Sequence, residues 1–227
     1  MAAVAAASRS DELAALCTGV SSCTACRLAE TRTQVVFGSG NPDSELMFVG
    51  EAPGFHEDQQ GLPFVGAAGK LLERLLGEIG LTRDDVFIGN VLKCRPPGNR
   101  DPLADEIEAC QEHLFRQIEL IQPRVVATLG NFATKLLSGD PTGITRVHGR
   151  QQDVRLGQSQ VLLYPIYHPA AALYTQAMLR VLEEDFRRLP ELLGGPQEPV
   201  AAVEAVPEPV RGEELAAQEA EPQLGLF

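Results

Sequence analysis

Four short apolar segments, separated by helical patterns, constrain the fold of this chain more than any other feature. Each reads as a buried strand, because a run rich in β-branched and other apolar residues ends in turn-forming residues. The segments are 45–50 (ELMFVG), 85–93 (DVFIGNVLK), 124–130 (RVVATLG) and 161–168 (VLLYPIYH). Strands that alternate with helices form a mostly parallel sheet covered on both faces. The sequence therefore predicts an α/β fold with about four central strands.

The segments between and after these strands have apolar residues at steps of three and four, the spacing of one helix face. Three such patterns are clear, in residues 67–80, 105–123 and 169–193. In the second, Pro123 follows the last apolar residue, where a helix commonly ends. We find no internal repeat, and a single folded domain over residues 1–195 is expected.

The composition changes after residue 195. Residues 196–222 contain seven glutamates against one arginine, together with several prolines and no aromatic residue. Such a segment cannot bury enough apolar surface to fold, so a disordered linker is expected; one short helix around residues 212–220 is the alternative. Because the tail carries half of the net charge of −12, the folded part is only mildly acidic. Nucleic-acid binding by a local basic face therefore stays open.

The sequence shows neither a membrane span nor a secretion signal. No segment approaches the ~20 apolar residues that cross a bilayer. The first residues are mostly alanines and lack a basic start, which argues against a signal peptide. A cytoplasmic monomer without a membrane partner is expected.

Four of the five cysteines suggest one thiolate site. Cys23 and Cys26 form a C-x2-C pair, whose spacing lets two thiolates reach one metal centre. Cys94 follows the second strand, and Cys110 lies in the next helix. Zinc, an iron–sulfur cluster and a redox dithiol all fit this spacing. Cys110 also fits a small core residue, since it lies on an apolar helix face, and Cys17 is expected to be a free thiol.

Polar residues stand at the carboxyl ends of the predicted strands, where open parallel sheets bind ligands. They are Glu51, Asn90, Asn131 and His168. The first lies in GEAPG (50–54), whose glycines suit a tight loop that lets backbone amides approach a ligand. Each residue also has a structural reading, as a solvated loop carboxylate, a capping amide or a packed imidazole. Their common location favours a site.

At this point the motifs resemble a known family. GEAPGFHEDQQGLPFVGAAGKLL, GNVLKCRPPGNRDP, CTACRL and YHPAAAL are similar to family 4 uracil-DNA glycosylases, the iron–sulfur branch of that superfamily in bacteria and archaea. The likeness covers residues 23–190, with the motifs in the family's order. It implies a three-layer α/β/α sandwich, excision of uracil from DNA in base excision repair, a structural [4Fe–4S] cluster and no catalytic metal. The implied cluster ligands are Cys23, Cys26, Cys94 and Cys110.

The resemblance also implies a role for each pocket residue. Phe64 would stack on the base, Asn90 would read its edge, and His168 would support departure of the uracil anion. Either Glu51 or Glu57 would position a water or balance the sugar cation. The uracil-binding set would be Gly50, Glu51, Ala52, Phe64, Asn90 and His168.

The sequence gives weaker signals for the residues that would contact the DNA outside the uracil pocket. Lys93, Arg95 and Arg100 are candidate phosphate contacts, with a solvated basic loop as the alternative, and Leu173 is a candidate wedge in the duplex. The related covalent uracil-binding branch has a basic, His-containing insertion that CRPPGNRDPLADE lacks, which favours a turnover enzyme. The competing hypothesis is a non-catalytic adaptor that binds uracil-containing DNA and recruits repair factors through its tail.

The last five residues, 223–227 (QLGLF), resemble the pentapeptide by which bacterial repair proteins bind the β sliding clamp. Gln223, Leu224, Leu226 and Phe227 stand at the matching places. A short extended peptide can place such apolar anchors in a groove, and a flexible linker of this length would span about 30 Å. The alternative is a tail that folds back onto its own sheet.

Overall fold

The computed structural model describes residues 8–194, which form a six-stranded mixed sheet in the order β1-β3-β2-β4-β6-β5. The linker and the terminal pentapeptide lie outside the described residues. The strands are β1 (Ser39–Gly40), β2 (Leu46–Gly50), β3 (Phe87–Asn90), β4 (Val125–Leu129), β5 (Gln152–Leu156) and β6 (Ser159–Ile166). The four central strands, β3, β2, β4 and β6, are parallel, and β1 and β5 pair antiparallel at the two edges.

The four predicted strands are confirmed as the parallel centre of the sheet, but the number of strands is corrected from about four to six. β1 has only two residues, too few for a periodic pattern. In β5, buried residues alternate with exposed or half-exposed ones (QDVRL), because this edge strand has one face toward solvent. The two edge strands therefore lack the continuous apolar run that predicts the central strands from the sequence.

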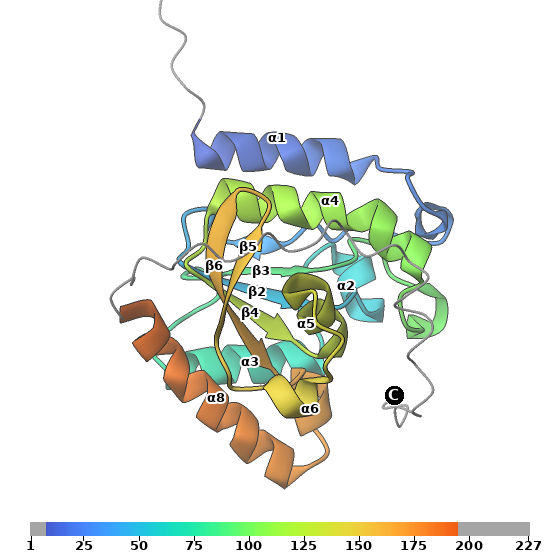
Figure 1. The fold of residues 1–227 in the computed structure, drawn as a ribbon. Helices are drawn as coiled ribbons and strands as arrows, with labels where there is room; N and C mark the ends of the chain where they lie inside the picture. Colours follow the sequence, from blue (N-terminus) through green and yellow to red (C-terminus); the bar gives the residue numbers. More distant parts are fainter. Residues whose placement is uncertain (1–7, 195–227) are drawn as a thin grey trace, which may run out of the picture.

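The helices are α1 (Arg9–Ser21), α2 (Phe55–Gln60), α3 (Ala67–Glu78), α4 (Ala104–Ile121), α5 (Asn131–Ser138), α6 (Ile144–Val147), α7 (Pro169–Ala172) and α8 (Gln176–Gly194), with 3-10 turns η1 (Arg27–Glu30) and η2 (Pro97–Asn99). The single pattern predicted over residues 169–193 is thus divided into α7 and α8. Figure 1 shows α4 on one side of the sheet with α1 lying along it, and α3 and α8 on the opposite side.

Alternate residues of the strands build two separate cores. In β2, Met47 and Val49 pack in the cluster that includes residues of α1, α4 and α5. Leu46 and Phe48 pack in the other cluster, with residues of α3 and α8. A strand that is buried on both faces must be apolar at every position. The predicted three-layer α/β/α sandwich is confirmed.

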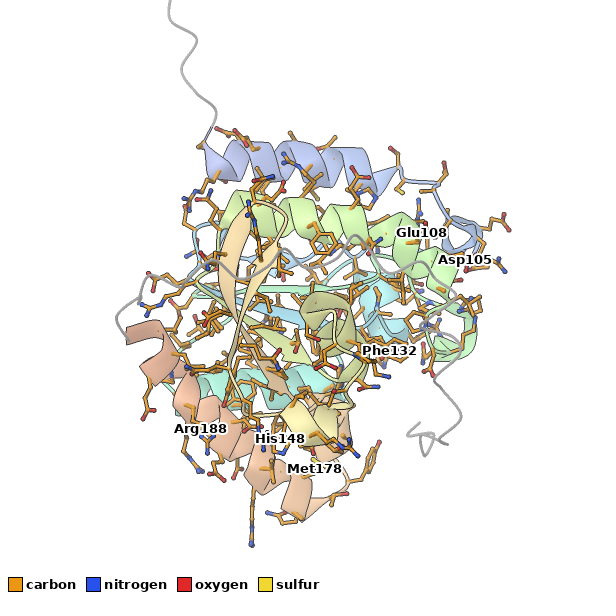
Figure 2. All side chains as sticks on the ribbon, in the orientation of Figure 1. Asp105, Glu108, Phe132, His148, Met178 and Arg188 are labelled. Carbon is orange, nitrogen blue, oxygen red and sulfur yellow. The ribbon has the colours of Figure 1, made fainter. Side chains whose placement is uncertain are left out.

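Besides its apolar packing, helix α8 makes polar contacts with the segment at the end of α6, in the region where Figure 2 labels His148 and Arg188. His148 Nδ1 lies 3.2 Å from Asp185 Oδ2, and Arg188 donates to the Gly149 carbonyl at 3.4 Å. Asp185 is buried, which raises the pKa of its carboxyl group. Among the helices of residues 8–194, none is both long and apolar enough to cross a membrane.

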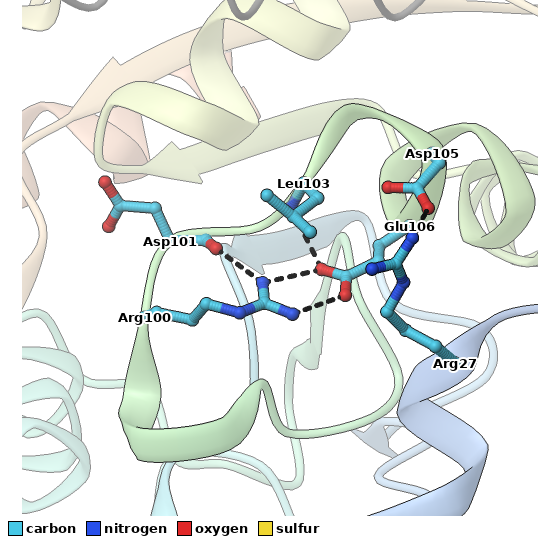
Figure 3. A network of polar contacts seen from close by, with 6 residues as sticks. All are labelled: Arg27, Arg100, Asp101, Leu103, Asp105 and Glu106. Atoms are coloured by element: carbon cyan, nitrogen blue, oxygen red, sulfur yellow. Dashed lines mark hydrogen bonds and ion pairs between the residues drawn. The ribbon is translucent and has the colours of Figure 1, made fainter.

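A buried carboxylate anchors the loop between β3 and α4 (Figure 3). Glu106 is 0% exposed and accepts two hydrogen bonds from Arg100, at 2.9 and 2.6 Å, and one from the Leu103 amide at 2.9 Å. Burial alone would raise the pKa of Glu106, but these hydrogen bonds and the charge of Arg100 lower it below its usual value. The neighbouring pair of Arg27 and Asp105, 2.9 Å apart, is exposed on both sides.

Removing the guanidinium from this buried pair should destabilise the protein. Arg100→Met leaves Glu106 buried without its counter-charge, and we expect the free energy of unfolding to fall by about 3 kcal/mol. Arg27→Met is the matched control, since it breaks an exposed pair and should cost less than about 1 kcal/mol. Urea unfolding of both variants at pH 7 measures the difference. Equal losses in the two variants would contradict the assignment of Glu106 as an anchor.

Candidate active site and cysteine cavity

The parallel register of β2 and β3 places Gly50 beside Asn90 at the carboxyl edge of the sheet. The pairing continues past the strands, because Val91 N–H donates to the Gly50 carbonyl at 2.9 Å. A Cβ atom on Gly50 would lie 2.4 Å from Asn90 Oδ1 and 2.8 Å from Phe64 Cζ. The absence of a side chain at Gly50 therefore lets the Asn90 amide and the Phe64 ring meet over the strand end.

Phe64 is held in a left-handed backbone conformation, with φ of 53°, which is rare for a bulky residue. Arg83 donates to the carbonyls of Phe64 and Pro63 at 2.9 and 2.6 Å. A Cβ on Gly69 would lie 1.8 Å from the Phe64 carbonyl oxygen, so only glycine allows this approach. Strain of this kind persists only where surrounding contacts enforce it and is concentrated at functional sites. The backbone contacts of the loop therefore fix the position of the Phe64 ring.

Glu57 contributes to the same loop. Its Oε1 accepts hydrogen bonds from the backbone amides of Val65 and Gly66, at 2.9 and 3.0 Å. The sequence did not predict this contact, because Glu57 and its partners are joined only by the fold of the loop. Glu51 and Ala52, the other predicted pocket residues, continue the chain directly from Gly50.

His168 follows β6 and lies beside Phe64, with ring centroids 5.6 Å apart. Its Nδ1 accepts the Ala170 N–H at 3.1 Å, as the N-cap of α7. A neutral imidazole that accepts at Nδ1 carries its proton on Nε2. Burial lowers the pKa of His168 to about 4, with the negative charge of Glu57 acting in the opposite direction. At neutral pH this side chain is therefore an uncharged donor through Nε2.

The structure thus places Gly50, Phe64, Asn90 and His168 near one another, four of the residues that the resemblance assigns to a uracil pocket. Asn131, the fourth polar residue at a strand end, has a different role: its Oδ1 accepts the Ile144 N–H at 3.2 Å and so supports the start of α6.

The four predicted cluster ligands line one cavity. Cys23 follows α1, Cys26 begins η1, Cys94 lies beyond β3, and Cys110 projects from α4. Cys17 lies on α1 and packs against the core. No group of three or more His, Cys, Asp or Glu side chains within residues 8–194 is arranged around a single ion position.

Nitrogen atoms lie within hydrogen-bonding distance of three of the cysteine sulfur atoms, and two of these nitrogens are N–H donors. The Lys93 amide donates to Cys110 Sγ at 3.3 Å, and Arg32 Nη1 lies 3.4 Å from Cys94 Sγ. His113 Nε2 lies 3.4 Å from Cys23 Sγ. Burial raises the pKa of Cys110 to about 11, and a thiol must lose its proton to bind a metal. Donors next to the sulfur atoms stabilise the thiolate form that ligation requires.

The candidate phosphate contacts have different environments. Lys93 is 1% exposed, and its Nζ donates to the Asn90 carbonyl at 2.8 Å and to Gln117 Oε1. The prediction of a surface contact is therefore wrong for Lys93, because its side chain turns inward to a partner on α4. The guanidinium of Arg100 is paired with Glu106. Arg95 lies over the ring of Phe55, 5.1 Å from its centroid. Leu173 is exposed at the end of α7.

A methyl group at position 50 should damage the pocket. Gly50→Ala must displace the Asn90 amide or the Phe64 ring, and a strained insertion of this kind costs about 1–3 kcal/mol. Binding of uracil, the ligand expected from the sequence, should weaken about tenfold or more in a calorimetric titration. Gly77→Ala is the control: nothing lies within 4 Å of its new Cβ, so uracil binding should not change. Unaltered binding by Gly50→Ala would contradict this geometry.

Comparison with known proteins agrees with this arrangement. Residues 37–189 match the family model of the uracil DNA glycosylase superfamily. The type-4 uracil-DNA glycosylase of Sulfurisphaera tokodaii is 50% identical over 178 residues, which are 76% of this chain and 81% of the relative. Those of Saccharolobus solfataricus and Archaeoglobus fulgidus are each 48% identical, over 81% and 78% of this chain and 87% and 92% of the relatives. The chain belongs to the uracil-DNA glycosylase superfamily.

Proposed function

We propose that this protein removes uracil from DNA by hydrolysing its N-glycosidic bond, the first step of base excision repair. The observation that carries the proposal is the meeting of the Phe64 ring and the Asn90 amide at Gly50, with the neutral His168 imidazole beside Phe64, in a chain of this superfamily. The target nucleotide must leave the base stack before such a pocket can reach it. An aromatic face then replaces the lost stacking, worth about 1–3 kcal/mol per base.

Asn90 is assigned the selection of uracil over cytosine. Uracil presents an N3–H donor beside the O4 acceptor, and one amide orientation accepts from the first and donates to the second. Cytosine presents the reverse pattern, so the same orientation rejects it by about 1–3 kcal/mol for a well-made pair. The amide is buried, and the Asn90 backbone is held on both sides, by the β2 register and by Lys93.

His168 is assigned the stabilisation of the leaving group. Cleavage leaves negative charge on uracil O2 and positive charge on the sugar. A hydrogen bond from Nε2–H to O2 strengthens as that charge develops, which lowers the barrier more than it stabilises the bound substrate. Glu51 and Glu57 are the two candidates for positioning the attacking water, and Glu57 Oε1 also accepts the backbone amides of Val65 and Gly66.

The thiols of Cys23, Cys26, Cys94 and Cys110 would hold the [4Fe–4S] cluster. Four cysteines around one cavity provide one thiolate for each iron, and N–H donors lie beside the sulfur atoms of Cys94 and Cys110. The cluster, when bound, would supply a structural cross-link. It would tie the segment after α1 to the loop after β3 and to α4.

We further propose that residues 223–227 bind the bacterial β sliding clamp. The support is the sequence QLGLF at the end of an acidic segment and a family whose substrate is DNA. The enzyme would then act in the cytoplasm, on newly replicated DNA.

Uracil release from a single-stranded oligonucleotide by the cluster-loaded protein tests the activity, and His168 makes a prediction about pH. Since the pKa of His168 is lowered to about 4, its imidazole stays neutral at all higher pH values. We expect a single-turnover rate without a step near the ordinary histidine pKa of about 6.5, and a large loss of rate in His168→Ala.

A rate that falls as the pH rises through about 6.5 would instead indicate an imidazolium acting as a general acid and would refute the assigned role. DNA binding without any free uracil from protein with its full content of iron and sulfide would support the non-catalytic adaptor.

Deletion of residues 223–227 should abolish binding to a purified β clamp in surface plasmon resonance while excision from short oligonucleotides is retained. The physical reason is that the apolar anchors Leu224, Leu226 and Phe227 belong to the peptide and not to the pocket. A matched control replaces Gln218, upstream of the motif, with alanine and should bind normally. A lower melting temperature of the deletion variant, with clamp binding intact, would favour the tail that folds back.

A further inference from the structure

Phe55 is an exposed aromatic residue beside the candidate active site. It is the first residue of α2 and directly follows the GEAPG loop that contains Gly50 and Glu51. Its side chain is 51% exposed, although burying a phenyl ring is among the larger apolar gains available to a fold. Its own neighbour His56 contacts it edge to face, at 5.5 Å between ring centroids. The fold leaves this ring at the surface next to the pocket.

Arg95 is held against that ring. The guanidinium carbon lies 5.1 Å from the Phe55 centroid, within the range of a cation–π contact. Arg95 Nε donates to Asn99 Oδ1 at 2.6 Å, and Asn99 has a left-handed φ of 54° in the η2 turn. Pro96 and Pro97 restrict the same turn. The guanidinium is therefore positioned before any ligand binds.

Arg95 also differs from its two basic neighbours in charge compensation. Lys93 is buried against backbone and amide oxygens, and Arg100 is paired with the carboxylate of Glu106. Among the ion pairs formed within residues 8–194, none includes Arg95. Of the three, Arg95 keeps a positive charge for an external anion.

We propose that Phe55 and Arg95 form a binding site for an unpaired nucleotide of the DNA strand, outside the uracil pocket: its base stacks on the pair and its phosphate binds the guanidinium. Exposed aromatic rings with adjacent arginines bind single-stranded nucleic acid in this way, because every base has a stacking face. Along the chain, Phe55 directly follows the loop after β2 that contains Gly50, and Arg95 directly follows Cys94. The proposal rests on the proposed action on DNA.

The test separates stacking from charge. Full-length, cluster-loaded protein is titrated with a fluorescein-labelled single-stranded oligonucleotide without uracil, over a series of salt concentrations. Phe55→Ala should weaken binding about tenfold with the same salt dependence. Arg95→Gln should reduce the slope of log K against log salt by about 0.7, the value for one phosphate on a single strand. Phe55→Tyr, which keeps a stacking face, should bind like the wild type.

Leu103→Ala is the matched control for loss of an exposed apolar side chain, since Leu103 is 40% exposed on the loop before α4, and it should bind normally. Circular dichroism melting shows that each variant is folded. Wild-type affinity and salt slope in both Phe55→Ala and Arg95→Gln would overturn the proposal. Uracil release by wild type together with that result would leave the glycosylase function intact. Weakened binding in a protein that releases no uracil would support the site and contradict the activity.

Discussion

The parallel pairing of β3, β2, β4 and β6 determines which loops and side chains of this protein can meet. Parallel strands end at one edge of a sheet, so residues far apart in sequence are brought to the same place. Gly50, Asn90 and His168 meet for this reason, and the register of β2 and β3 sets the first two side by side. The apolar residues that bury both faces of the sheet thus also determine where the chemistry lies.

Two glycines at close approaches then determine how the side chains pack at the carboxyl edge of the sheet. Gly50 has no side chain, which leaves room for the Asn90 amide and the Phe64 ring, and Gly69 allows the Phe64 carbonyl to approach α3. Arg83 and Glu57 hold the loop on either side of Phe64. A site held in this way is ordered without a ligand, so little binding energy would be lost to ordering side chains when the proposed base binds.

A buried lysine connects the two functional regions. The Lys93 amide donates to Cys110 Sγ, while its ammonium donates to the carbonyl of Asn90 and to Gln117. Gln117 in turn donates to the Phe37 carbonyl at 2.8 Å. Because buried polar groups are costly unless each is satisfied, this chain of hydrogen bonds restricts how β3 and α4 can move relative to one another. The cysteine cavity and the Asn90 amide, which we propose reads the base, therefore share one rigid support.

Local signals in the sequence, namely apolar runs, C-x2-C spacing and turn residues, were enough to predict the central strands, the four cysteines that line one cavity and the polar residues at the strand ends. The sequence did not reveal the edge strands, the inward turn of Lys93, the pairing of Arg100 with Glu106 or the use of Asn131 to support α6. The edge strands were missed because β1 is very short and β5 has one face toward solvent, whereas the environments of the three side chains depend on packing. A polar side chain takes the partner that leaves no buried group unsatisfied, and that partner is identified only when the elements have packed.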